Sequence, residues 1–136
     1  MKYLLDTNVC VVLLRNSHSG VSTRLSAEPP GSIALCAIVR AELLYGAERS
    51  AQTARNVAEV NQFVAPFPSL PFDDHCAAEY GALRAELERQ GLRIGANDLF
   101  IAAIALANQL TLVTHNVAEF SRVPSLNIED WEAATP

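Results

Sequence analysis

The sequence predicts an α/β fold, a three-layer α/β/α arrangement in which helices cover both faces of a central, mostly parallel sheet of four to five short strands. The first observation behind this prediction is that short apolar segments alternate with longer segments of helical periodicity. The second is that no repeat, low-complexity tract or long linker divides the 136 residues. We therefore expect residues 1–136 to form a single domain.

The strands are expected where short apolar runs end at turn-forming residues, at 2–5, 32–35 and 110–114, with weaker candidates at 70–72 and 126–128. The helices are expected where apolar residues recur at helical spacing, at 7–15, 21–27, 38–48, 51–64, 73–90 and 97–108. Because helices separate the strands, crossover connections should make the sheet parallel.

Two of these helices carry a further prediction. Asp73 or Asp74 can cap the helix at 73–90, whose apolar stripe is formed by Ala77, Tyr80, Leu83 and Leu87. The helix at 97–108 is apolar on nearly every side and should be buried.

Composition and charge exclude several classes of protein. Half of the residues are apolar, which excludes a disordered chain. The net charge of −5 disfavours a nonspecific duplex-DNA coat protein.

The longest apolar run, residues 99–107, is far shorter than the roughly 20 residues of a membrane span, and Asp6 interrupts the only candidate signal sequence. The cysteines, Cys10, Cys36 and Cys76, are interpreted as core residues of a reduced protein. We expect a soluble cytoplasmic protein.

Three carboxylates stand in apolar contexts. Asp6 follows the first strand, Glu42 lies within a helix that has no clearly solvent-facing side, and Asp98 begins the most apolar helix. Each has an ordinary alternative, because Asp6 and Asp98 can act as helix caps and Glu42 can be solvated. Asn97 is an equally good cap for the last helix, which makes Asp98 redundant in that role.

Parallel sheets bind ligands beyond the carboxyl ends of their strands, which directs attention to Asp6 and to residues 114–116. Three acids gathered at one such edge repel each other and need a cation. Oxygen ligands favour Mg²⁺ or Mn²⁺ over zinc, and such a site suits hydrolysis of a phosphodiester by metal-activated water.

Other chemistries lack their motifs. The chain has no GxGxxG, no GxxxxGK[ST] and no GxSxG, and its histidines lack metal-ligand spacing. His115 is interpreted as a solvated loop residue. The run at 6–9 resembles the nucleophile loop of haloacid-dehalogenase-type phosphatases but has Asn8 where that family uses Asp. A response-regulator receiver would need a late lysine, and Lys2 is the only lysine.

Four segments in order closely resemble VapC-type toxins of the PIN-domain family: LLDTNV at 4–9, RAELLYGAERS at 40–50, NDLFIAAIALANQLTLVTHNVAEF at 97–120 and IEDW at 128–131. The resemblance implies a PIN fold and a Mg²⁺- or Mn²⁺-dependent endoribonuclease toxin of a type II toxin–antitoxin system. It also implies a homodimer and a VapB-type antitoxin, through which alone DNA is bound. By analogy with relatives, a structured RNA such as tRNA is the expected target.

The resemblance also assigns site residues. The metal ligands carry over to Asp6, Glu42 and Asp98, and a fourth acidic position falls at Asn116, which is counted among the catalytic residues although an amide supplies no charge. Glu119, one helical turn later, is a candidate to replace it. The resemblance places hydroxyls of the site at Thr7 and Thr114.

Arginines 40, 49, 84, 89 and 93 are candidates for contact with the RNA backbone, with the alternative that Arg84, Arg89 and Arg93 only solvate one helix. Arg40 is the arginine predicted to bind substrate, together with Thr7 and Thr114. Asn116 also leaves an alternative open, a non-catalytic PIN module that binds RNA or a protein.

Overall fold

The structure is a computed structural model that describes residues 1–16, 18–29 and 31–132. Within these ranges, five strands form one sheet in the order β3-β2-β1-β4-β5, and all neighbouring strands are parallel. The strands are β1 (Tyr3–Leu5), β2 (Ile33–Cys36), β3 (Ser69–Leu70), β4 (Thr111–Val113) and β5 (Ile128–Glu129). The predicted parallel sheet of four to five short strands is confirmed.

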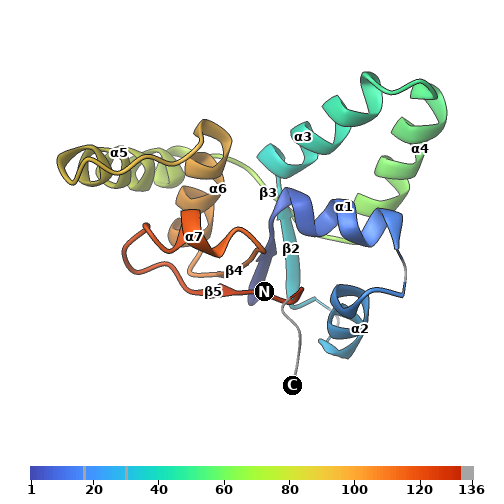
Figure 1. Cartoon of the computed structure of the whole chain (residues 1–136), viewed down its shortest axis with the longest axis horizontal. Coiled ribbons are helices and arrows are strands. Elements are labelled where there is room, and N and C mark those ends of the chain that lie inside the picture. Colours follow the sequence, from blue (N-terminus) through green and yellow to red (C-terminus); the bar gives the residue numbers. More distant parts are fainter. Residues whose placement is uncertain (17, 30, 133–136) are drawn as a thin grey trace.

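The helices form the two outer layers (Figure 1). On one side lie α1 (Thr7–Arg15), α2 (Gly20–Ala27), α3 (Ala37–Glu48) and α4 (Thr53–Val64). On the other lie α5 (Asp74–Arg89), α6 (Ala96–Ala107) and α7 (Val117–Phe120). The chain steps from β1 to β2 to β3 in one direction and then returns to the other side of β1, so right-handed crossovers place the later helices on the opposite face.

The strand order therefore reverses between β1 and β4. Loops that follow these two neighbouring strands leave toward opposite faces of the sheet, which opens a crevice at their carboxyl ends. Asp6 comes directly after β1 and Thr114 directly after β4. The topology thus brings together the two chain segments that the sequence pointed to.

The core lies on both faces of β1 and around α6. All three residues of β1 are buried, and α6 is buried from Ile101 to Ala105, as its apolar sequence predicts. Asp73 caps α5 by accepting a hydrogen bond from the Cys76 N–H at 3.0 Å. No helix in the described part of the chain is both long and apolar enough to cross a membrane.

Several local predictions need correction. The buried stripe of α5 contains Cys76 in place of the exposed Ala77. The edge strands β3 and β5 are displaced by one to two residues from the predicted segments, because pairing with the neighbouring strand defines a two-residue strand more than its own sequence does. The helix α7 was not predicted, since four residues are too few to show a period.

The helix α3 also differs from its prediction, because one of its sides is solvent-facing: Ala41, Tyr45 and Glu48 are exposed. The three cysteines are buried and unpaired, which confirms their interpretation as core residues.

Candidate active site

Asp6 is a buried carboxylate, only 4% exposed, at the junction of β1, β4 and α1. The Thr7 N–H donates to its Oδ1 at 2.7 Å, so Asp6 does cap α1, and Thr114 Oγ1 donates to its Oδ2 at 2.8 Å. Burial raises the pKa of Asp6 against the effect of these two hydrogen bonds, and the charges of Glu42 and Glu119 raise it further. The capping role and a functional role therefore coexist in one side chain.

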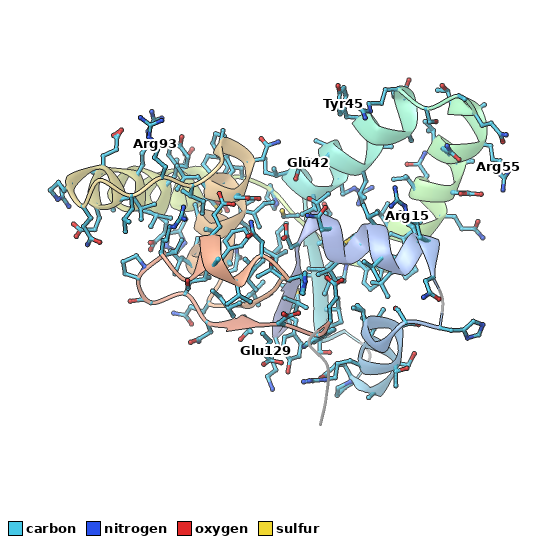
Figure 2. All side chains as sticks on the ribbon, in the orientation of Figure 1. Arg15, Glu42, Tyr45, Arg55, Arg93 and Glu129 are labelled. Atoms are coloured by element: carbon cyan, nitrogen blue, oxygen red, sulfur yellow. The ribbon has the colours of Figure 1, made fainter. Side chains whose placement is uncertain are left out.

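Glu42 lies on the side of α3 that faces α6, and both of its oxygens accept hydrogen bonds (Figure 2). Thr7 Oγ1 of α1 donates to Oε1 at 2.5 Å, and Asn97 Nδ2 of α6 donates to Oε2 at 3.2 Å. The prediction that Asn97 caps α6 is wrong, because Gly95 occupies that position and Asn97 reaches across to α3 instead. Glu42 is half-buried and bonded, in contrast to a freely solvated surface glutamate.

Asp98 and Glu119 lie beside the same backbone segment. The Gly95 N–H donates to Glu119 Oε1 at 2.5 Å, and a Cβ at Gly95 would lie 3.5 Å from that oxygen and 3.6 Å from Asp98 Oδ2. Burial and then the charges of Asp6, Glu119 and Glu42 raise the pKa of Asp98 to about 7. The Gly95 N–H lowers the pKa of Glu119, so this carboxylate stays ionised beside its neighbour.

Asn116 serves as a hydrogen-bond donor in the structure. Its Nδ2 donates to Glu119 Oε2 at 2.7 Å, and its N–H donates to Thr114 Oγ1 at 3.0 Å. Thr114 therefore connects Asp6 to Asn116, which in turn orients Glu119. The four carboxylates that interact through these contacts and charges are called the acidic site below: Asp6, Glu42, Asp98 and Glu119.

Two residues discussed in the sequence analysis, Arg40 and His115, lie apart from these contacts. Arg40 precedes Glu42 by two residues, so its side chain projects from α3 about 200° around the helix axis from that of Glu42. Among the described residues, Arg40 makes no hydrogen bond or ion pair with the acidic site. His115 is exposed, as predicted, but its Nδ1 lies 3.1 Å from Asp130 Oδ2, and this carboxylate raises the pKa of His115.

Sequence reasoning missed two contributors, the amide of Asn97 and the N–H of Gly95. The sequence suggests only a capping role for Asn97. However, a polar residue in the first turn of a buried helix, next to the candidate ligand Asp98, can also donate a hydrogen bond to another ligand of the same site. The Gly95 contact could not be inferred, because it joins the N-cap of α6 to a residue of α7 that lies 24 positions later.

The donor chemistry of the acidic site fits a hard divalent cation. Its four carboxylates form no ion pair with any side chain in the described ranges, and the charges of their neighbours contribute to the raised pKa of Asp6 and of Asp98. Carboxylate, hydroxyl and amide oxygens are the ligands of Mg²⁺ and Mn²⁺. No three His, Cys, Asp or Glu side chains of residues 1–16, 18–29 and 31–132 are already arranged to hold one ion, because the carboxylates point to separate donors. Binding of a cation therefore requires that these carboxylate side chains rotate toward it.

Comparison with known sequences matches the PIN domain family over residues 3–126. The chain is 40% identical over 133 residues to Ribonuclease VapC2 of Rickettsia felis, covering 97% of this chain and 99% of the relative. It is 38% identical over 131 residues to the tRNA(fMet)-specific endonuclease VapC of Shigella flexneri, covering 96% and 98% of the two chains.

Among solved structures, a chain of the DNA-bound VapBC crystal structure from Salmonella typhimurium superposes with a TM-score of 0.92. That chain is 37% identical, and the match covers 96% of this chain and 98% of that one. A chain of VapBC2 from Rickettsia felis, bound to a DNA fragment from its promoter, gives a TM-score of 0.89 at 39% identity, with coverage of 96% and 99%.

Proposed function

The chain belongs to the PIN domain family, and from this premise we propose that it is a Mg²⁺- or Mn²⁺-dependent endoribonuclease of the VapC type, the toxin of a type II toxin–antitoxin system. The observation that carries the proposal is the acidic site, four carboxylates without a basic partner in the described residues. Natural proteins rarely retain such repulsion unless a ligand relieves it.

The four carboxylates have different environments and therefore different roles. Asp6 is fixed by Thr7 and Thr114 at the end of β1, which makes it the rigid ligand of the set. Glu42 is oriented by Thr7 and Asn97 from two helices. Asp98, with a pKa of about 7, holds a proton near neutral pH that a bound cation displaces, so cation affinity should rise with pH.

Glu119 and Asn116 complete the site from α7 and the loop before it. Asn116 orients Glu119 through its amide, and Glu119 in turn fixes the Gly95 N–H at the start of α6. We assign them as secondary ligands or as groups that act through water. A bound Mg²⁺ supplies the Lewis acid and the activation of water that hydrolysis of a phosphodiester requires.

The RNA substrate and the partners follow from the relatives. The Shigella flexneri relative is a tRNA(fMet)-specific endonuclease, and we propose a structured RNA, a tRNA, as substrate. The two solved structures compared above are VapBC complexes bound to DNA. We propose that this chain forms a homodimer, binds a VapB-type antitoxin, contacts DNA only through it, and acts in the cytoplasm.

The test is an RNA cleavage assay with added Mg²⁺, in chelator, and with Asp6→Asn. This variant keeps an acceptor oxygen for the Thr7 N–H and so preserves the cap of α1 while it removes the charge. We expect cleavage by the wild type with Mg²⁺ only and none by Asp6→Asn. The products should carry 5′-phosphate and 3′-hydroxyl ends, because water is the nucleophile.

Two outcomes would change the proposal. Products with 2′,3′-cyclic phosphate would exclude water as the nucleophile. RNA binding without cleavage in Mg²⁺ or Mn²⁺ would instead establish the alternative, a non-catalytic PIN module that binds RNA.

A further inference from the structure

We propose that a groove between α1, α3 and α4 holds the backbone of the RNA segment that adjoins the cleaved bond, and that Arg15 and Arg49 contact its phosphates. This inference rests on the proposed function and extends it from the acidic site to the path of the substrate. It depends on three features: the partners of the arginines, the continuity of the groove with the acidic site, and the charge inside the groove.

The arginines divide into two groups by their partners. Four of them are bound to acidic side chains: Arg24 to Glu28 and Glu129, Arg55 to Glu59, Arg84 to Glu88 and Arg89 to Glu86. The other five have no ion pair in the described part of the chain, and of these Arg15 and Arg49 line the groove. The Arg49 guanidinium lies 5.7 Å from the centre of the Tyr45 ring. An unpaired guanidinium is free to bind phosphate in bidentate fashion.

The groove begins at the acidic site. Its volume is about 360 Å³, and it is lined by Thr7 and Glu42 at one end and by Arg15, Arg49 and Asn56 farther along. Figure 2 shows Arg15 on the side of α1 that faces α3 and α4. A strand whose phosphate lies at Glu42 can therefore continue past both arginines without leaving the surface.

The end of the groove away from the acidic site carries positive charge. Of the two carboxylates in the groove, Glu59 is paired with Arg55 at 3.2 Å, and Glu42 keeps its charge at the opposite end, within the acidic site. Arg15 and Arg49 therefore face the groove without a carboxylate that neutralises them. This charge complements RNA, although the net charge of the chain is −5.

An aromatic ring lies along the same helix. Glu42, Tyr45 and Arg49 are spaced by three and four residues, so they form one stripe on α3 about 10 Å long. Tyr45 is 65% exposed, which leaves its ring available for stacking by an unpaired base. The stripe thus offers a carboxylate at the cleaved bond, a stacking surface and a phosphate contact, in that order.

A purely structural role for the arginines makes a different prediction. Arg15 is the last residue of α1 and Arg49 the C-cap of α3, where a positive charge stabilises the helix end. If that were their only role, their removal would lower the melting temperature and leave RNA affinity unchanged.

The experiment compares Arg15→Gln, Arg49→Gln and the double variant with Arg24→Gln, a matched control on α2 whose arginine is paired and does not line the groove. Cleavage of a transfer RNA transcript in Mg²⁺ gives kcat and KM, and binding of the same transcript in chelator is measured over a range of salt concentrations. We expect each groove variant to raise KM several-fold with kcat unchanged. The slope of log affinity against log salt should fall by about 0.7 for each arginine, and Arg24→Gln should match the wild type.

The contrary outcomes are distinct. Cleavage by the wild type with unchanged KM and salt slope in the double variant would overturn this inference and leave the proposed function standing. An equal effect of Arg24→Gln would mean that any surface arginine contributes to RNA binding as much as those of the groove, and it would also overturn the inference. Unchanged RNA cleavage together with weaker binding of a purified VapB-type antitoxin would assign the groove to a protein. A wild type that neither binds nor cleaves RNA would remove the proposed function and this inference together.

Discussion

Acidic side chains at two ends of the molecule have opposite surroundings. Where α2 packs against the C-terminal strand, Arg24 binds Glu28 at 3.0 Å and Glu129 at 3.3 Å, and its guanidinium lies 4.9 Å from the centre of the Trp131 ring. At the other end, the carboxylates of the acidic site have hydroxyl, amide and N–H donors but no ion pair in the described ranges. Figure 2 labels Glu129 and Glu42 at these opposite ends.

The difference separates charged side chains that stabilise the fold from charged side chains that bind a ligand. Compensated charges such as those around Arg24 stabilise the folded chain modestly and need nothing else. Uncompensated carboxylates a few ångströms apart destabilise it, because two like charges about 4 Å apart repel by roughly 4 kcal/mol at an effective dielectric constant of 20. A site of this kind is expected to exchange stability for function, and that exchange can be measured at single residues.

The largest effect is expected for Asp98→Asn. Cleavage should fall by more than about 100-fold, since loss of a mere outer-shell partner of a metal ligand already lowers activity by 10–100-fold. The melting temperature in chelator should rise at the same time, because the charges of Asp6, Glu119 and Glu42 oppose ionisation of Asp98. The measurements are an RNA cleavage assay and thermal unfolding with and without Mg²⁺, which should stabilise the variant less than the wild type.

The pH dependence of stability provides an independent check on the predicted rise in melting temperature. The pKa of Asp98 is raised from 3.8 to about 7, so between these values the folded protein binds more protons than the unfolded chain. Stability of the metal-free wild type should therefore fall as pH rises from about 4 to 7, and Asp98→Asn should show less of this fall. A metal-free variant that melts well below the wild type would contradict the argument and indicate that Asp98 mainly stabilises the first turn of α6.

A smaller effect is expected for Asn97→Ala, which tests whether Glu42 needs its donor from α6. As a positioning residue, Asn97 should affect Mg²⁺ affinity and kcat by about 10-fold, with KM for RNA nearly unchanged. Alanine favours a helix, so the melting temperature in chelator should not fall. Asn61→Ala, at an exposed position of α4, is the matched control. Normal Mg²⁺ affinity in Asn97→Ala would mean that Thr7 alone orients Glu42.

The sequence predicts the part of the site that depends on topology. Asp6 and Thr114 could be placed together because each follows a recognisable strand and parallel strands end at one edge. The contact between Glu42 and Asn97 could not be predicted, because it joins two helices 55 positions apart and depends on how these helices pack. The helix α7, which places Glu119 against Gly95, could not be predicted either, because four residues are too few to show a helical period.

The smallest effect is expected at the compensated end, for Arg24→Ala. Exposed ion pairs contribute about 0.2–1 kcal/mol and an exposed cation–π contact about 0.5–1 kcal/mol, and the Arg24 side chain is 43% exposed, so we expect a loss of about 1 kcal/mol in the free energy of unfolding. Denaturant titration measures this loss, which should shrink at high salt.

The comparison requires that Mg²⁺-dependent stabilisation and RNA cleavage of Arg24→Ala stay at wild-type values, because Arg24 has no contact with the acidic site. Arg55→Ala, which removes one exposed i,i+4 ion pair and one exposed hydrogen bond to Gln52, should have less effect than Arg24→Ala. A changed response to Mg²⁺ in Arg24→Ala would show that the two ends are coupled through the sheet, and the separation of fold charges from ligand charges would then be wrong.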